Sequence, residues 1–149
     1  MSARQHPGET VGSWMMRGVL KFLTEPDNNE AQKLRDNFVF KVLPMLNPDG
    51  VVNGNYRCSL AGCDLNRRWK YPSKLVHPTV YHTKKLLREI HSERGVVMYC
   101  DLHGHSRKHN IFIYGCDSKE YWEECRILPF ILSKLSPLFS FSESRFNIQ

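Results

Sequence analysis

A histidine and a glutamate stand three positions apart near the start of the sequence, in His6-Pro-Gly-Glu9. A neutral imidazole and a carboxylate on a tight Pro-Gly turn can converge on one metal ion, and zinc accepts such ligands at about 2.0–2.2 Å. A surface turn leading into a helix, with Glu9 beside the helix N-terminus, explains the same pattern. Taken alone, the tetrapeptide favours that simpler interpretation.

A third possible ligand follows an apolar, β-forming segment, Val96–Cys100. Two histidines, His103 and His105, come shortly after it, and α/β sheets keep their functional side chains at the carboxyl ends of strands. One such histidine would complete three protein ligands and leave a fourth position open, as in catalytic zinc sites. The spacing leaves the choice between the two histidines open. Asp101 is a candidate to orient a histidine ligand by a hydrogen bond.

Between these segments, residues 51–78 are rich in Gly, Asn, Pro and Ser and resemble a long irregular loop. Long loops inside compact domains are usually functional. Arg57, Asn66 and Arg67 lie in this loop, and guanidinium and amide groups are suited to gripping a carboxylate. Without further context, a basic surface loop is an equally good interpretation.

The composition describes an ordinary soluble globular protein, with 41% hydrophobic and 24% charged residues among 149. No apolar run approaches the roughly 20 residues of a membrane-spanning helix, and the first residues lack a stretch of signal-peptide length. We therefore expect neither a membrane partner nor secretion.

Charge and cysteine content restrict the partners and the compartment. The net charge of +6 favours acidic partners, which could be nucleic acid or acidic polypeptide tails. No nucleic-acid-binding motif is recognised, so we do not expect nucleic acid. The five cysteines, an odd number, fit reduced thiols better than a disulfide framework. Cys58 and Cys63 lack a second ligand pair, which argues against a structural metal clip between them.

Alternating helical and apolar extended segments indicate an α/β fold. Asn47-Pro-Asp-Gly predicts a turn, and Thr10 is a possible helix cap. The apolar periodicity predicts helices at Val11–Leu23, Ala31–Asp36, Thr79–Glu93 and Lys119–Leu135, the last interrupted at Pro129. Buried strands are predicted at Phe38–Met45, Val96–Cys100 and Ile111–Tyr114. Arg145–Gln149 resembles a strand that has only begun, and little precedes the first loop, so we expect a domain truncated at both ends.

In this order the segments resemble the M14 family of zinc carboxypeptidases, whose pattern is HPGE, NPDG, an NR pair and a strand ending in DxH. The local forms are similar to those of the cytosolic carboxypeptidase subfamily, and especially to its tubulin-processing members. They read HPGET-x-x-SW, LPMLNPDGVVNGNYRCSLAGCDLNRRW and DLHGHSRKHNIFIYGCD. The resemblance runs over nearly the whole chain.

The resemblance implies a role for each candidate residue. It assigns one zinc ion per domain to His6, Glu9 and His103, and so favours His103 over His105. Arg57 matches the arginine that stabilises the oxyanion of the attacked carbonyl. Asn66 and Arg67 match the pair that holds the terminal carboxylate of the substrate. It also implies a mixed sheet flanked by helices, with residues 1–149 forming part of one catalytic domain.

The family's glutamate general base lies on a late strand, well after the DxHxHS segment. None of the acidic residues after His103 stands in that motif; these residues are Asp117, Glu120, Glu123, Glu124 and Glu143. We interpret them as solvated or structural. We therefore expect the chain as given to hydrolyse little or nothing.

The function implied by the resemblance is release of C-terminal amino acids, in particular glutamate from polyglutamylated proteins such as tubulin. It implies a cytoplasmic location, associated with the cytoskeleton, centriole or cilium. Three alternatives are a non-catalytic fragment that binds zinc or acidic tails, a nucleic-acid module, and a zinc acylase with the same His-x-x-Glu opening. The NPDGVVNGNYR and DLNRRW segments favour the carboxypeptidase over the acylase.

Overall fold

The computed structural model describes residues 1–147, which form two compact units, Met1–Gly104 and a second unit that begins at His105. Within the first unit, the helices and strands are β1 (Ser2–Ala3), α1 (Val11–Thr24), α2 (Asn29–Asn37), α3 (Pro48–Val52), the 3-10 helix η1 (Leu65–Arg67), α4 (Pro78–Arg94) and β2 (Asp101–Leu102). The second unit contains β3 (Tyr114–Cys116), α5 (Glu124–Leu135) and β4 (Arg145–Asn147). The expectation that residues 1–149 form part of one catalytic domain stays a prediction.

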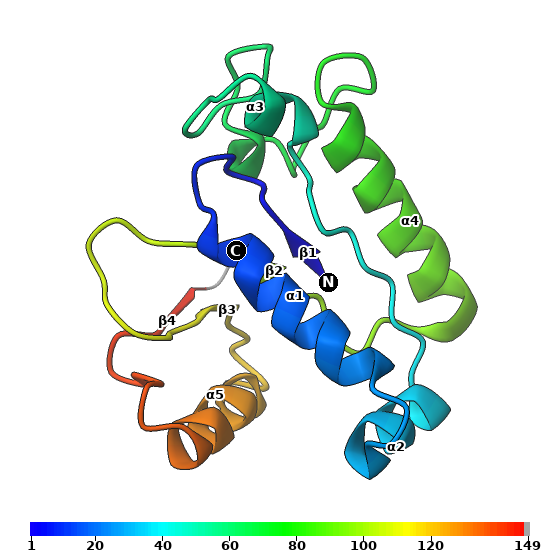
Figure 1. Ribbon diagram of the computed structural model, residues 1–149, viewed down its shortest axis with the longest axis vertical. Helices are drawn as coiled ribbons and strands as arrows, with labels where there is room; N and C mark the ends of the chain where they lie inside the picture. Colours follow the sequence, from blue (N-terminus) through cyan, green and yellow to red (C-terminus); the bar gives the residue numbers. More distant parts are fainter. Residues whose placement is uncertain (148–149) are drawn as a thin grey trace. The chain divides into compact units, whose positions relative to one another are not determined.

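A small parallel sheet organises the first unit. β1 pairs with β2, so that Ser2 lies opposite Asp101 and Ala3 opposite Leu102. On its other edge, β1 runs beside the segment around Leu43, whose carbonyl accepts a hydrogen bond from the Ala3 amide at 3.1 Å. Three segments far apart in the sequence therefore lie side by side, with β1 in the middle (Figure 1).

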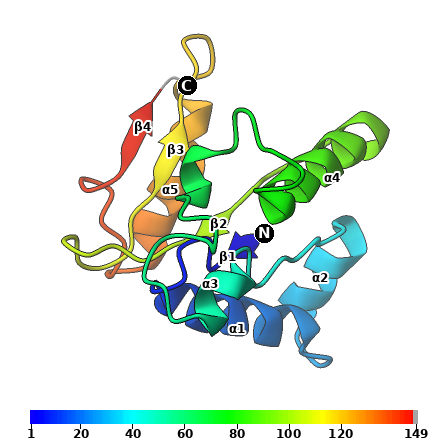
Figure 2. The same ribbon diagram turned by 90° about the horizontal axis from the view of Figure 1, so that it is seen from above.

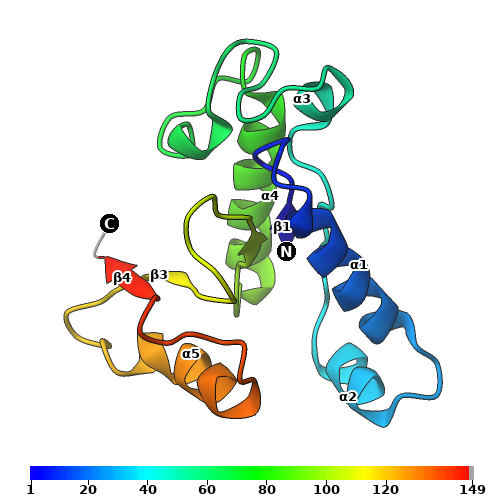
Figure 3. The same cartoon turned by 60° about the vertical axis from the view of Figure 1, so that its left-hand side comes forward.

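Two long helices flank this small sheet. α1 packs against β1 and β2, and α1 and α4 lie on opposite sides of β1 (Figures 2 and 3). The observed bounds of α1 agree with the prediction, and its buried face consists of Gly12, Met16 and Leu23. Thr10 occupies the N-cap position, but its side chain makes no capping hydrogen bond, so its predicted capping role is wrong.

Two of the predicted buried strands do not form. Residues 38–42 and 96–100 belong to no strand, and Phe38 and Val97 are 46% and 84% exposed. An extended segment becomes a strand only when a neighbouring segment pairs with its backbone. Within residues 1–147, only Leu43 in the first segment forms a bridge, and the second becomes a strand only from Asp101 onward.

The Asn47-Pro-Asp-Gly segment forms the first turn of α3 rather than an isolated turn. Asn47 caps this helix, since its Oδ1 atom accepts a hydrogen bond from the Gly50 amide at 3.1 Å. Pro48 suits the first helical position, because it has no amide hydrogen to leave unpaired there. The segment that follows is irregular apart from η1, in agreement with the predicted loop.

In the second unit, β3 and β4 form a parallel pair beside α5 (Figure 3), with Gly115 opposite Phe146. The predicted strand at Ile111–Tyr114 is displaced, because β3 begins only at Tyr114. α5 begins five residues later than predicted and continues through Pro129, which removes one helical hydrogen bond without ending the helix. β4 agrees with the predicted final strand up to Asn147; positions 148 and 149 lie outside the described residues. No described helix is long and apolar enough to cross a membrane.

Candidate metal centre

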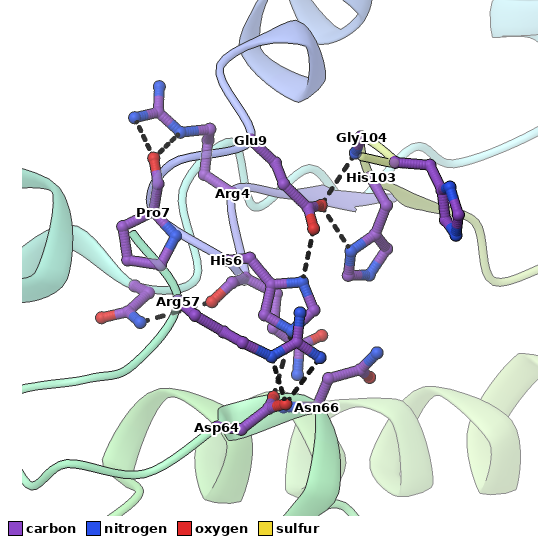
Figure 4. A network of polar contacts seen from close by, with 12 residues as sticks. Arg4, His6, Pro7, Glu9, Arg57, Asp64, Asn66, His103 and Gly104 are labelled. Atoms are coloured by element: carbon purple, nitrogen blue, oxygen red, sulfur yellow. Dashed lines mark hydrogen bonds and ion pairs between the residues drawn. The ribbon is translucent and has the colours of Figure 1, made fainter. Parts of the chain in front are cut away.

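Two imidazoles and one carboxylate converge at the carboxyl ends of β1 and β2 (Figure 4). His6 and Glu9 lie on the turn between β1 and α1, and His103 follows β2 directly. Because β1 and β2 are parallel neighbours, their carboxyl ends meet at one edge of the sheet. One ligand atom from each of the three residues lies within 4.8 Å of the others. The structure thus brings together the three residues that the sequence predicted as zinc ligands.

The orientation of the two imidazole rings fits a zinc site. Each ring directs Nδ1 to the Glu9 carboxylate, at 2.9 Å from His6 and 3.0 Å from His103. Each ring directs Nε2 to another carboxylate, since His6 meets Asp64 at 3.0 Å and His103 meets Asp101 at 2.7 Å. Carboxylates at Nε2 fix the tautomer that leaves Nδ1 free to coordinate a cation. Two nitrogens and a carboxylate are a donor set that zinc accepts.

The electrostatics of the cluster favour a cation. Burial raises the pKa of the Glu9 carboxyl, but hydrogen bonds from His103, His6 and the Gly104 amide outweigh it and hold that pKa well below its usual range. For His103, burial lowers the pKa, and hydrogen bonds to Asp101 and Glu9 outweigh this and raise the pKa to about 9. The donors around Glu9 therefore keep its carboxylate ionised, and the raised pKa of His103 results from the two carboxylates beside its ring.

Close backbone contacts hold the His6–Glu9 turn in place. The Gly8 amide donates to the Tyr56 carbonyl at 2.7 Å, and a Cβ atom on Gly8 would lie only 2.8 Å from that oxygen. A Cβ atom on Gly50 would similarly lie 2.9 Å from the Cys58 carbonyl. The glycines of the HPGE and NPDG motifs therefore allow the turn, α3 and the segment on both sides of Arg57 to pack together.

Arg4 stabilises the same turn through hydrogen bonds of its guanidinium group. Its backbone adopts a left-handed conformation, with φ of 53°, which is uncommon for a residue with a side chain. Its guanidinium donates to the Pro7 carbonyl at 3.1 and 2.6 Å and to the Ser13 hydroxyl at 2.9 Å. These bonds connect the turn to the first helical turn of α1.

Arg57 lies next to the metal ligands. Its guanidinium binds one oxygen of Asp64 through Nε at 2.9 Å and Nη2 at 2.8 Å, and 46% of its side chain remains exposed. An open cavity of about 450 Å³ borders it; the lining residues are Asn53, Asn55, Tyr56, Arg57, Cys58, Ser59, Leu60 and Gly62. A donor group held beside the metal centre and open to solvent can meet a bound ligand.

Asn66 and Arg67 lie on η1. Asp64 caps this helix, because its Oδ1 atom accepts a hydrogen bond from the Asn66 amide at 2.9 Å. Arg67 is exposed, and its Nη1 atom is 3.4 Å from the Asn66 carbonyl. The sequence analysis missed Asp64. A usable signal was its position as the single acidic residue among eight basic ones between residues 57 and 88.

The second histidine candidate, His105, and the acidic residues that follow His103 lie in the second unit. His105 is not in the ligand cluster; its Nδ1 atom accepts hydrogen bonds from the Arg107 and Lys108 amides at 3.2 and 3.0 Å. Among the acidic residues after His103, Asp117 pairs with Arg126 at 2.9 Å and Glu143 pairs with Lys108 at 3.3 Å.

The sequence profile of the zinc carboxypeptidase family, Peptidase_M14, matches residues 1–136. The chain is 53% identical to human cytosolic carboxypeptidase 2 and 51% identical to mouse cytosolic carboxypeptidase 3, with all of this chain covered in both comparisons. Among solved structures, a putative carboxypeptidase A from Shewanella denitrificans superposes with a TM-score of 0.88 at 31% identity, over 99% of this chain and 40% of that one. A metallo-carboxypeptidase from Burkholderia cenocepacia gives a TM-score of 0.86 at 31% identity, over 97% of this chain and 39% of that one.

The chain therefore belongs to the zinc carboxypeptidase family, and the predicted α/β class and family resemblance are confirmed. It spans only 17% of the human relative and 15% of the mouse relative. The family membership implies zinc as the metal of the His6, Glu9 and His103 cluster.

Proposed function

We propose that this chain provides the zinc-binding and substrate-binding part of a metallocarboxypeptidase that releases C-terminal amino acids. The observation that carries the proposal is the convergence of His6, Glu9 and His103 beside Arg57, with η1 joined to both through Asp64. We assign one zinc ion to the three ligands. A bound zinc ion would polarise the scissile carbonyl and activate a water molecule near neutral pH.

The side chains around the metal centre have separate tasks in this proposal. Arg57 donates hydrogen bonds to the carbonyl oxygen as negative charge develops on it, and a preorganised donor of this kind is typically worth ~2.7–4 kcal/mol. Asn66 and Arg67 bind the free carboxylate of the substrate, which only a terminal residue presents. The enzyme would therefore remove residues from C-termini and leave internal peptide bonds intact.

We further propose that the substrates are acidic tails, with glutamate released from polyglutamylated proteins such as tubulin. The excess of basic residues between positions 57 and 88 supports this, because it surrounds the proposed carboxylate-binding pair with positive charge. The relatives named above are called cytosolic. A cytoplasmic location, in association with the cytoskeleton, centriole or cilium, is part of the same proposal.

The chain as given would bind zinc and acidic tails but cleave them slowly, because no residue in it is assigned as the general base. Asp117 and Glu143 each pair with a basic side chain, which supports a structural role for them. Loss of a general base typically removes a factor of ~10²–10⁴ in rate. Binding without cleavage is accordingly the alternative function of this chain.

Zinc titration tests the metal centre. We expect the chain to bind one zinc ion in competition with a chromophoric chelator, and His103→Ala to lower the zinc affinity at least a hundredfold. His105→Ala is the matched control, because His105 lies outside the cluster, and it should leave the affinity unchanged. Equal effects of the two substitutions would contradict the assignment.

A peptidase assay tests the expected low activity. Glutamate release from a polyglutamate peptide should depend on zinc and stay at least a hundredfold below that of a full-length cytosolic carboxypeptidase measured in parallel. Zinc-dependent turnover equal to that of the full-length relative would show that a residue of this chain acts as the base.

A further inference from the structure

The Asp64 carboxylate uses all of its acceptor capacity. Oδ1 accepts from His6 Nε2 at 3.0 Å and from the Asn66 amide at 2.9 Å. Oδ2 accepts from Arg57 Nε at 2.9 Å and Arg57 Nη2 at 2.8 Å. A carboxylate offers about four acceptor sites in total. Every one of them is directed at a neighbour in this cluster (Figure 4).

The three partners of Asp64 belong to three different parts of the proposed site. His6 is a metal ligand, Arg57 is the donor for the carbonyl oxygen, and the Asn66 amide belongs to η1, which carries the carboxylate-binding pair. We propose that Asp64 is a positioning residue that fixes these three parts relative to one another. This inference rests on the proposed function and names the residue that holds the metal ligand and the substrate-binding groups in their relative positions.

Asp64 is suited to this task by its environment. Its side chain is only 19% exposed, and that of His6 is 5% exposed, so water competes little for the bond between them. Charge-assisted hydrogen bonds are shorter and stronger than neutral ones. Displacement of the carboxylate would therefore move the imidazole, the guanidinium and η1 together.

Asp101 provides a natural comparison within the same centre. It binds the Nε2 atom of the other histidine ligand, His103, at 2.7 Å, and its second oxygen accepts from the Ser2 hydroxyl at 2.6 Å. No contact joins Asp101 to Arg57 or to η1 among the described residues. Asp64 and Asp101 thus each support a histidine ligand, but only Asp64 also holds Arg57 and caps η1.

An amide at position 64 would separate these tasks. If its oxygen faces His6 and the Asn66 amide, its NH₂ group faces the Arg57 guanidinium, and two donors then oppose each other. Asp64→Asn should therefore release Arg57 from its position even if the cap of η1 survives. Asp101→Asn makes the same chemical change without affecting Arg57.

The experiment compares the parent chain with Asp64→Asn, Asp101→Asn and the combination of each with Arg57→Gln. Zinc affinity is measured by chelator competition, and the affinity for a tri-glutamate peptide is measured by calorimetry at a zinc concentration that saturates each variant. Circular dichroism and thermal melting establish that each variant is folded.

Both aspartate substitutions should lower zinc affinity by about 10–100-fold, as is typical for groups that orient metal ligands. Only Asp64→Asn should also lower the tri-glutamate affinity, by about tenfold or more. Arg57→Gln should weaken tri-glutamate binding in the parent and in Asp101→Asn, and should add little in Asp64→Asn, where Arg57 is already displaced.

If Asp64→Asn matches Asp101→Asn in both measurements, Asp64 supports only His6 and the inference is overturned. If the parent chain binds no zinc, the proposed function itself fails. The two failures are distinguishable, because the first is observed in a chain that binds zinc normally.

Discussion

At the scale of single residues, His103 links the metal centre to pH. Hydrogen bonds to Asp101 and Glu9 outweigh the effect of burial and raise its pKa to about 9, from an ordinary value of 6.5. An imidazole with its ordinary pKa would be almost entirely neutral at pH 8. His103 is instead mostly protonated at that pH, and it must lose a proton from Nδ1 before that atom can coordinate a cation.

We therefore expect zinc binding at pH 8 to release about one proton from His103. The release should decrease as the pH rises through about 9, because His103 is then already neutral. Calorimetric titration in two buffers with different ionisation enthalpies measures the number of protons released. A release that is negligible at pH 8 would contradict the raised pKa.

At the scale of elements, the short helix α3 contributes to the site although none of its residues is a predicted ligand. Asn47 is 2% exposed; its side chain accepts from the Gly50 amide and donates to the Gln5 carbonyl at 3.3 Å. Gly50 in turn packs closely against Pro7, between the two ligands of the first turn. Capping of α3 is therefore coupled to the position of the metal ligands.

Asn47→Ala should destabilise the chain by about 1–2 kcal/mol, the upper part of the range for loss of an N-cap, and should also lower zinc affinity severalfold. Asn28→Ala is the matched control, because Asn28 caps α2 by the same bond to the Ala31 amide at 3.0 Å and contacts no ligand. Urea unfolding and chelator competition measure the two effects. A similar loss of zinc affinity in both variants would mean that the effect is general destabilisation.

At the scale of the whole molecule, large apolar side chains are exposed on segments that carry unpaired backbone groups. In the first unit, Val39 is 59% exposed, Val97 84% and Met98 55%, and their segments belong to no strand. Exposed apolar side chains on unpaired extended segments favour association with other chains. The chain in isolation should therefore self-associate in a concentration-dependent way.

Val97→Lys should reduce this self-association, because a charged side chain on an exposed edge disfavours pairing. The stability of the monomer should change by less than about 0.5 kcal/mol, as is usual for surface substitutions. Analytical ultracentrifugation over a range of concentrations measures the association. Val52→Lys, at the end of α3 where the side chain is 90% exposed, makes the same change in net charge outside these segments and is the control. Equal reductions in the two variants would assign the effect to charge alone.

The sequence by itself determined the residue types of the site, the four longer helices and the family. The ligands His6 and Glu9 are close because they stand three positions apart on one tight turn. The bounds of α1 follow from the local apolar periodicity. Motif order then identified His103 and Arg57.

The tertiary structure decided what depends on neighbours. It showed that Phe38–Met45 and Val96–Cys100 remain largely unpaired, because strand formation requires a partner that local sequence does not specify. It also revealed Asp64, whose importance lies in simultaneous contacts with residues 58 positions before it, seven before it and two after it. Contacts across such different separations arise only when the chain has folded, so the local charge pattern could single out Asp64 but could not predict these contacts.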